Sequence, residues 1–310
     1  MTSGWQLTLK RPVSCCGIGL HSGKPVQLRI LPAPADSGIV FVREDLAGKP
    51  EIPALSEKVL DTSLATTLGQ KGKSVGTVEH LMAALRGLGI DNARVELNGP
   101  EVPILDGSAA PFVSLLQEAG LREQAVPRTY IVIKKAVTVR SGDKFASLAP
   151  ALEFRVDCTV DFQHPLITNQ SFGMKVTPQS FVEELARART FCFLEDIEKL
   201  KQVGLAQGGS LENAIVIDTF SILNPEGLRF PDEFVRHKFL DALGDLALLG
   251  KPLLGHLTAY KTGHTLNHQL VQAVLSDANA FELLRLRPEE ADLSVSALIP
   301  GAVTPSPRIA

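Results

Sequence analysis

The sequence predicts an α+β protein built from two similar domains. The chain has 310 residues, 45% of them hydrophobic, which is enough to build two compact cores. Each half shows short strand-like runs followed by a helix, a strand and a second helix. In each half one helix carries a histidine near an acidic residue: His80 beside Glu79, and His237 near Asp241. No residue-level repeat accompanies this order, so the similarity is predicted for the fold alone.

The first half is predicted to open with a β-hairpin. Strand-like alternation at residues 6–12 and 26–31 flanks a glycine-rich turn at 17–23. No amphipathic helix follows this turn, which argues against a phosphate-binding loop and places His21 on the surface. The remaining elements expected here are strands at 38–42, 51–55 and 92–97, a helix at 77–86 capped by Thr77, and a helix at 109–119.

The second half is predicted to begin after a polar, proline-containing segment at 122–128. We therefore expect an N-terminal domain at 1–125, a C-terminal domain at 126–285 and a loose tail at 286–310. The elements expected in the C-terminal domain are strands at 130–139, 154–160 and 253–261, and helices at 178–188, 232–249 and 265–275.

Charge and cysteine content exclude several classes of protein. A net charge of −3 and a pI near 6.2 argue against a nucleic-acid partner bound mainly by charge. The four cysteines form no CxxC pair, so we expect neither a disulfide framework nor a thiolate metal site. The N-terminus lacks a signal-peptide pattern, and no apolar run approaches the roughly 18 residues of a transmembrane helix. We expect a monomeric cytoplasmic protein.

The helix predicted at 232–249 carries a candidate site. His237 and Asp241 are four residues apart, so both side chains project from one face and can share a metal ion. Asp245 extends the same stripe by one turn. The stripe is also compatible with the solvated face of an amphipathic helix, and short motifs taken alone favour that interpretation.

The helix predicted at 77–86 could complete this site. A catalytic zinc ion takes three nitrogen or oxygen ligands and keeps one position open for water. His80, His237 and Asp241 would supply that ligand set, and Glu79 could accept the proton of the water. His264 could stabilise charge on the reacting oxygen or protonate the leaving amine. Spacing alone does not establish that residues so far apart in the sequence converge.

Longer stretches of the chain resemble one enzyme family, the UDP-3-O-acyl-N-acetylglucosamine deacetylases, which are zinc amidases of lipid A biosynthesis. The resemblance runs from about residue 5 to 275. Because many stretches match the family in the same order, they favour a metal site on the helix at 232–249 over a solvated helix face. The matching stretches include GIGLHSG at 17–23, TVEHL at 77–81, PILDGSAAPF at 103–112, ARTF at 188–191, DEFVRHK at 232–238 and AYKTGH at 259–264.

The resemblance implies hydrolysis of the N-acetyl group of UDP-3-O-acyl-N-acetylglucosamine to a free amine and acetate. It implies one Zn²⁺ ion, or Fe²⁺ in its place, bound by His80, His237 and Asp241. It also implies roles for the neighbouring residues: Glu79 as general base, His264 as the charge-stabilising acid, Asp245 as its orienting partner, Thr190 at the oxyanion, and Phe191 and Lys238 as substrate contacts.

The resemblance further implies two βααβ-type layers with helices packed between sheets, each with an insert. The inserts are expected at about 40–55 and 190–217, the second forming an apolar passage for the acyl chain. Ile197, Ala214 and Val216 are the passage residues we single out. The same apolar residues could instead form a small satellite core. A metal-dependent amidase acting on a different nucleotide sugar is the alternative function, and a non-catalytic module is disfavoured because Glu79 and every ligand are present.

Overall fold

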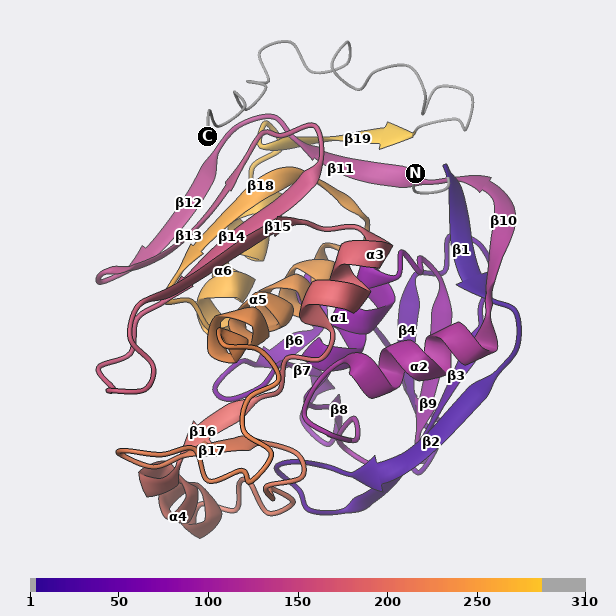
Figure 1. Ribbon diagram of the computed structural model, residues 1–310. Coiled ribbons are helices and arrows are strands. Elements are labelled where there is room, and N and C mark those ends of the chain that lie inside the picture. The colour runs from indigo at the N-terminus through magenta and orange to yellow at the C-terminus, as the bar shows by residue number, and fades with distance from the viewer. Residues whose placement is uncertain (1–3, 286–310) are drawn as a thin grey trace.

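The computed structural model describes residues 4–285 and shows the predicted α+β class (Figure 1). Helices lie between a five-stranded and a seven-stranded sheet, and one continuous hydrophobic core joins these layers. The tail expected at 286–310 lies outside the described residues. Within the described part of the chain, no helix is both long and apolar enough to cross a membrane.

The five-stranded sheet belongs to the first half of the chain. Its strands, in spatial order, are β2 (Val13–Ile18), β3 (Pro25–Pro32), β9 (Ala93–Leu97), β4 (Ile39–Arg43) and β5 (Glu51–Pro53). A hairpin forms across the glycine-rich turn as predicted, with β2 and β3 paired antiparallel. Its first strand is β2 and not the predicted run at 6–12, which lies mostly in β1 (Trp5–Leu9) and pairs with a later strand. Alternate residues of β3 (Val26, Leu28 and Ile30) are buried, as expected for a strand with one face on the core.

Two segments of the first half differ from their expected roles. Residues 40–55, the expected insert, contribute β4 and β5 to the main sheet, where β4 runs parallel to β9. A separate three-stranded sheet instead follows, made of β6 (Val59–Asp61), β7 (Thr67–Gln70) and β8 (Lys73–Val75). The polar segment 122–128 is largely a strand, β10 (Leu121–Pro127), which pairs antiparallel with β1 (Trp5–Leu9) before the chain enters the second large sheet.

The seven-stranded sheet belongs to the second half. The single strand expected at 130–139 is wrong, because the chain turns between β11 (Thr129–Ile133) and β12 (Val137–Ser141). At that turn the backbone N–H groups of Lys134 and Lys135 donate to the carbonyl of Ala280. The other strands are β13 (Lys144–Ala149), β14 (Phe154–Val160), β15 (Gln170–Lys175), β18 (Leu253–Tyr260) and β19 (Phe281–Arg285).

The helices follow the predicted positions with shifted ends. They are α1 (Glu79–Gly87), α2 (Ala110–Ala119), α3 (Pro178–Ser180) continued by a π-helical turn at Phe181–Leu185, α5 (Glu233–Leu246) continued by a 3₁₀ turn at Ala247–Leu249, and α6 (His264–Ser276). Thr77 does not cap α1, because its hydroxyl donates to Glu101 and its φ of 53° precedes a helix that begins at Glu79.

Residues 190–217 form a small unit beside the main body. It consists of β16 (Phe191–Phe193), α4 (Leu194–Gln202) and β17 (Ile215–Ile217), with β16 and β17 paired parallel. Figure 1 shows this unit projecting below the helices of the main body.

Helices α1 and α5 cross at a very short distance. A Cβ atom on Gly244 of α5 would overlap the backbone of Glu79 in α1, so the crossing requires glycine at this position. Every residue of α5 except Arg236 and Lys238 is buried. The interpretation of its polar stripe as a solvated face is therefore wrong, and the stripe points into the protein.

We expect Gly244→Ala to disturb this crossing. The added methyl group has no space, so the helices must separate, and overpacking of this kind typically lowers the free energy of unfolding by about 1–3 kcal/mol. Urea unfolding and metal analysis of the same preparation measure the two consequences, lower stability and lower metal occupancy. Unchanged stability together with full metal occupancy would contradict the importance of this contact.

Candidate active site

Helices α1 and α5 bring His80, His237 and Asp241 together. Their candidate ligand atoms all lie within 4.8 Å of one another, and all three side chains are buried. Oδ1 of Asp241 is 3.6 Å from Nε2 of His80 and 3.3 Å from Nε2 of His237. The two imidazole rings stand nearly perpendicular, and these distances place both Nε2 atoms beside Oδ1. This arrangement offers two nitrogens and one oxygen to a single cation.

The chemistry of these donors fits a divalent cation. Oδ1 of Asp241 is buried and has no hydrogen-bond partner among the described residues, which is costly unless a cation occupies the space it faces. Nδ1 of His237 lies 3.2 Å from the carbonyl oxygen of Ala188 and can donate its proton there, which leaves Nε2 free to bind metal. Burial lowers the pKa of His237 to about 3, so the ring is neutral at pH 7, as a ligand must be.

Lys238 contacts the second oxygen of the same carboxylate. Its ammonium group donates to Oδ2 of Asp241 at 2.7 Å. Burial opposes ionisation of Asp241, but His237 and Lys238 hold the pKa of this carboxyl well below its usual value. The ammonium group also lies 5.6 Å from the centre of the Phe191 ring. Asp241 is thus an ionised carboxylate whose Oδ1 atom is available to a metal.

Glu79 and His264 lie beside this cluster. Oε1 of Glu79 is 3.9 Å from Nε2 of His264, and Oε2 accepts a hydrogen bond from the backbone N–H of Thr66 at 3.0 Å. Burial raises the pKa of Glu79. Glu79 is therefore a carboxylate held beside the ligands with one oxygen fixed and the other directed towards His264.

Asp245 orients His264. Oδ2 of Asp245 lies 2.9 Å from Nδ1 of His264, so Nε2 faces Glu79 and Asp241. Burial opposes the charged imidazolium, but the charges of Asp245, Glu79 and Asp241 outweigh it and raise the pKa of His264 to about 10. His264 is thus protonated at neutral pH and can donate from Nε2.

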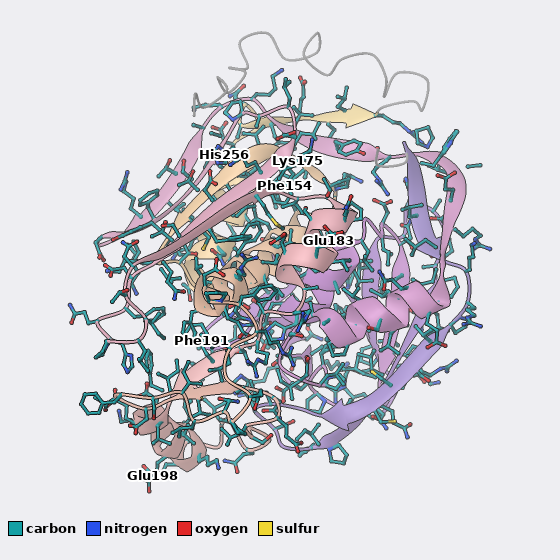
Figure 2. All side chains as sticks on the ribbon, viewed as in Figure 1. Phe154, Lys175, Glu183, Phe191, Glu198 and His256 are labelled. Atoms are coloured by element: carbon teal, nitrogen blue, oxygen red, sulfur yellow. The ribbon has the colours of Figure 1, made fainter. Side chains whose placement is uncertain are left out.

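A cavity of about 540 Å³ opens from this cluster towards the small unit at 190–217. Its walls are mainly apolar, as in many small-molecule sites. Figure 2 shows Phe191 where this unit meets the main body. Of the residues predicted from sequence, those lining the cavity are Glu79, His80, Thr190, Phe191, Ile197, Ala214, Val216, His237, Lys238, Asp241 and His264. Asp245 lies behind His264 and outside the lining.

Thr190 is fixed at the cavity wall by backbone hydrogen bonds. Its N–H donates to the carbonyl of Gly107 at 2.8 Å, and its own carbonyl accepts from the N–H of Ile215 at 2.8 Å. A Cβ on Gly107 would overlap the carbonyl of Asn213, so glycine permits this close approach. The turn at Gly107, inside the matching stretch 103–112 and just before α2, therefore anchors the wall that carries Thr190.

His21 is the site residue that sequence reasoning placed wrongly. The predicted surface residue lines the cavity and is only partly exposed. Its turn is fixed by Glu101, whose carboxylate accepts from the N–H groups of His21 and Ser22, each at 2.9 Å. The turn also contacts the small unit, because the N–H of Gly208 donates to the carbonyl of Leu20. One feature of the sequence could have indicated this role: His21 lies inside GIGLHSG at 17–23, a stretch that resembles the family.

Comparison with known proteins agrees with this geometry. A model of the family described as UDP-3-O-acyl N-acetylglycosamine deacetylase matches residues 6–276. The chain belongs to this family. A protein of Myxococcus xanthus named UDP-3-O-acyl-N-acetylglucosamine deacetylase is 61% identical over 308 residues, which is 98% of each chain. A protein of the same name from Anaeromyxobacter sp. is 58% identical over 303 residues, which is 98% of each chain. One from Shewanella baltica is 52% identical over 300 residues, which is 96% of this chain and 98% of the relative.

We expect this member of the family to bind one divalent cation per chain at His80, His237 and Asp241. His237→Ala removes one of three ligands and should abolish stoichiometric binding, measured by metal analysis after dialysis. The matched control is His256→Ala, because His256 pairs with Asp157 on the outer face of the seven-stranded sheet and should leave metal content unchanged. A His237→Ala protein with full metal occupancy would contradict the assignment.

Proposed function

We propose that the protein hydrolyses the N-acetyl group of UDP-3-O-acyl-N-acetylglucosamine, releasing acetate and a free amine, as a step in lipid A biosynthesis. The observation that carries this proposal is the convergence of a three-ligand cluster, an acid–base pair and an apolar cavity in one site. Family membership and the printed names of the relatives support the same reaction and substrate. Location in the cytoplasm and a monomeric state stay predictions.

The cation that we propose is Zn²⁺, with Fe²⁺ as the alternative, held by His80, His237 and Asp241. When bound, such a cation lowers the pKa of a water molecule and polarises a carbonyl group. The donor set of two imidazoles and one carboxylate, with no thiolate, is typical of hydrolytic rather than structural zinc sites.

Glu79 is the proposed general base. Its Oε1 atom faces the site, while Oε2 is occupied by the N–H of Thr66. The raised pKa of this buried carboxyl makes it a stronger base than an exposed glutamate. Glu79 would therefore take the proton from the attacking water as the water adds to the acetyl carbonyl.

His264 is the proposed acid. Its protonated ring can stabilise negative charge on the former carbonyl oxygen and then deliver a proton to the amine as the C–N bond breaks. Asp245 holds Nδ1 and thereby keeps Nε2 directed into the site. Thr190, at the cavity wall, is the proposed second contact to the oxyanion.

The apolar part of the cavity is the proposed passage for the acyl chain. Ile197, Ala214 and Val216 line it, and Phe191 and Lys238 lie between it and the metal ligands. Each methylene group buried there would contribute about 0.8 kcal/mol to binding. The satellite-core interpretation fits less well, because these side chains border open space in which a chain can lie.

We expect kcat/KM to show a bell-shaped pH dependence. The Glu79 carboxylate must be ionised, which gives the acidic limb, and its raised pKa moves that limb above the usual carboxyl range. His264 must be protonated, and a raised pKa means that activity persists through neutral pH and is lost as pH rises towards about 10. A bound cation adds positive charge and lowers this pKa, so the alkaline limb should fall at or below that value.

Two variants test which residue gives each limb of the pH profile. Glu79→Gln should lower kcat by roughly 10²–10⁴-fold while keeping the metal, and His264→Ala should remove the alkaline limb. A flat profile in the wild type would contradict an acid–base pair. Loss of metal in Glu79→Gln would instead identify Glu79 as a ligand.

We expect acetate release from UDP-3-O-acyl-N-acetylglucosamine and very little from UDP-N-acetylglucosamine, although the amide bond is the same. Ile197→Glu or Ala214→Asp should lower kcat/KM for the acylated sugar and leave metal content unchanged. Leu275→Glu is the control, because Leu275 is exposed on α6 and does not line the cavity. Equal kcat/KM with and without the acyl chain would contradict the passage. Preferred hydrolysis of another nucleotide sugar would establish the alternative function.

A further inference from the structure

Thr66 lies between Glu79, the proposed base, and Asp245, the partner of the proposed acid His264. It belongs to the segment between β6 and β7 and is almost completely buried, with 1% of its surface exposed. It does not line the cavity, and it lies between the matching stretches at 17–23 and 77–81, outside both. Its backbone and side chain nevertheless contact both the proposed base and the partner of the proposed acid.

Three hydrogen bonds join Thr66 to these elements. Its N–H donates to Oε2 of Glu79 at 3.0 Å, and its hydroxyl donates to Oδ1 of Asp245 at 2.6 Å. Its carbonyl accepts from the N–H of Val78, the residue before α1, at 3.2 Å. One residue of a loop thus connects the start of α1 to the end of α5.

These contacts determine which carboxylate oxygens are free. Because Thr66 occupies Oε2 of Glu79, Oε1 is the oxygen left to face His264. Because its hydroxyl occupies Oδ1 of Asp245, Oδ2 is the oxygen that His264 and Asn267 share, at 2.9 Å and 2.8 Å. The bond to a charged carboxylate is short and buried, which is the setting in which a hydrogen bond constrains geometry most.

We propose that Thr66 is a positioning residue that sets the relative orientation of Glu79 and the Asp245–His264 pair. This inference rests on the proposed function for the roles of Glu79 and His264. Thr66 itself touches no substrate, so it acts only through these neighbours. Its hydroxyl bond to Asp245 can be removed by mutation while its backbone bond to Glu79 remains.

Thr66→Val tests the proposal with little change of shape. Valine leaves Oδ1 of Asp245 buried without its donor, so the carboxylate can rotate and release His264. Loss of a hydrogen bond to a charged group predicts a decrease in kcat of about 10- to 100-fold. KM for the acylated sugar and metal content should change by less than about twofold, because cavity and ligands are intact. Thr66→Ser, which keeps the hydroxyl, should restore most of the lost rate.

A matched control and a second readout separate positioning from general damage. Thr67→Val removes the neighbouring hydroxyl, which takes no part in the hydrogen bonds to Glu79 and Asp245, and should behave as the wild type. In ¹⁵N-histidine spectra of the zinc-loaded protein, Thr66→Val should shift the His264 ring signals, and Thr67→Val should not. This readout does not depend on turnover.

The outcomes are distinct. A Thr66→Val enzyme with wild-type kcat and an unshifted His264 signal would overturn the proposal. Loss of metal or of the folded state in both Thr66→Val and Thr66→Ser would also overturn it, because the role of Thr66 would then be structural. If the wild type releases no acetate, the proposed function fails, while the His264 signal still decides whether Thr66 holds the Asp245–His264 pair.

Discussion

The close crossing of α1 and α5 at Gly244 is the constraint on which the site depends. It places the first turn of α1, with Glu79 and His80, against the face of α5 that carries His237, Asp241 and Asp245. Neither helix holds a complete ligand set. The cluster of three candidate ligands forms only because the backbones approach more closely than a side chain at residue 244 would allow.

Burial of so many ionisable groups has an electrostatic consequence. Glu79, Asp241 and Asp245 are three buried acids, and an uncompensated buried charge is strongly destabilising. The protonated His264 and Lys238 offset part of this negative charge. A divalent cation at Oδ1 of Asp241, which has no hydrogen-bond partner among the described residues, would offset more of this negative charge. Metal binding is therefore expected to increase the free energy of unfolding.

The sequence could predict what depends on local spacing. The i, i+4 relation placed His237 and Asp241 on one face, and alternation at 26–31 predicted β3, the second strand of the hairpin. It could not show that the stripe of α5 is buried, because burial depends on which helix packs against it. The turn between β11 and β12 could not be recognised within 130–139, since both strands contribute apolar residues to this run. His21 and Thr66 were missed because each belongs to a loop whose partners lie in distant segments.

The most direct test is an anomalous-diffraction map of crystals of the zinc-loaded protein, collected at the zinc absorption edge. The account predicts one peak per chain at about 2.0–2.2 Å from Nε2 of His80, Nε2 of His237 and Oδ1 of Asp241. Glu79 and His264 should lie beside the peak but outside ligand distance. A peak bound through Glu79 or His264, or no peak between α1 and α5, would contradict the account.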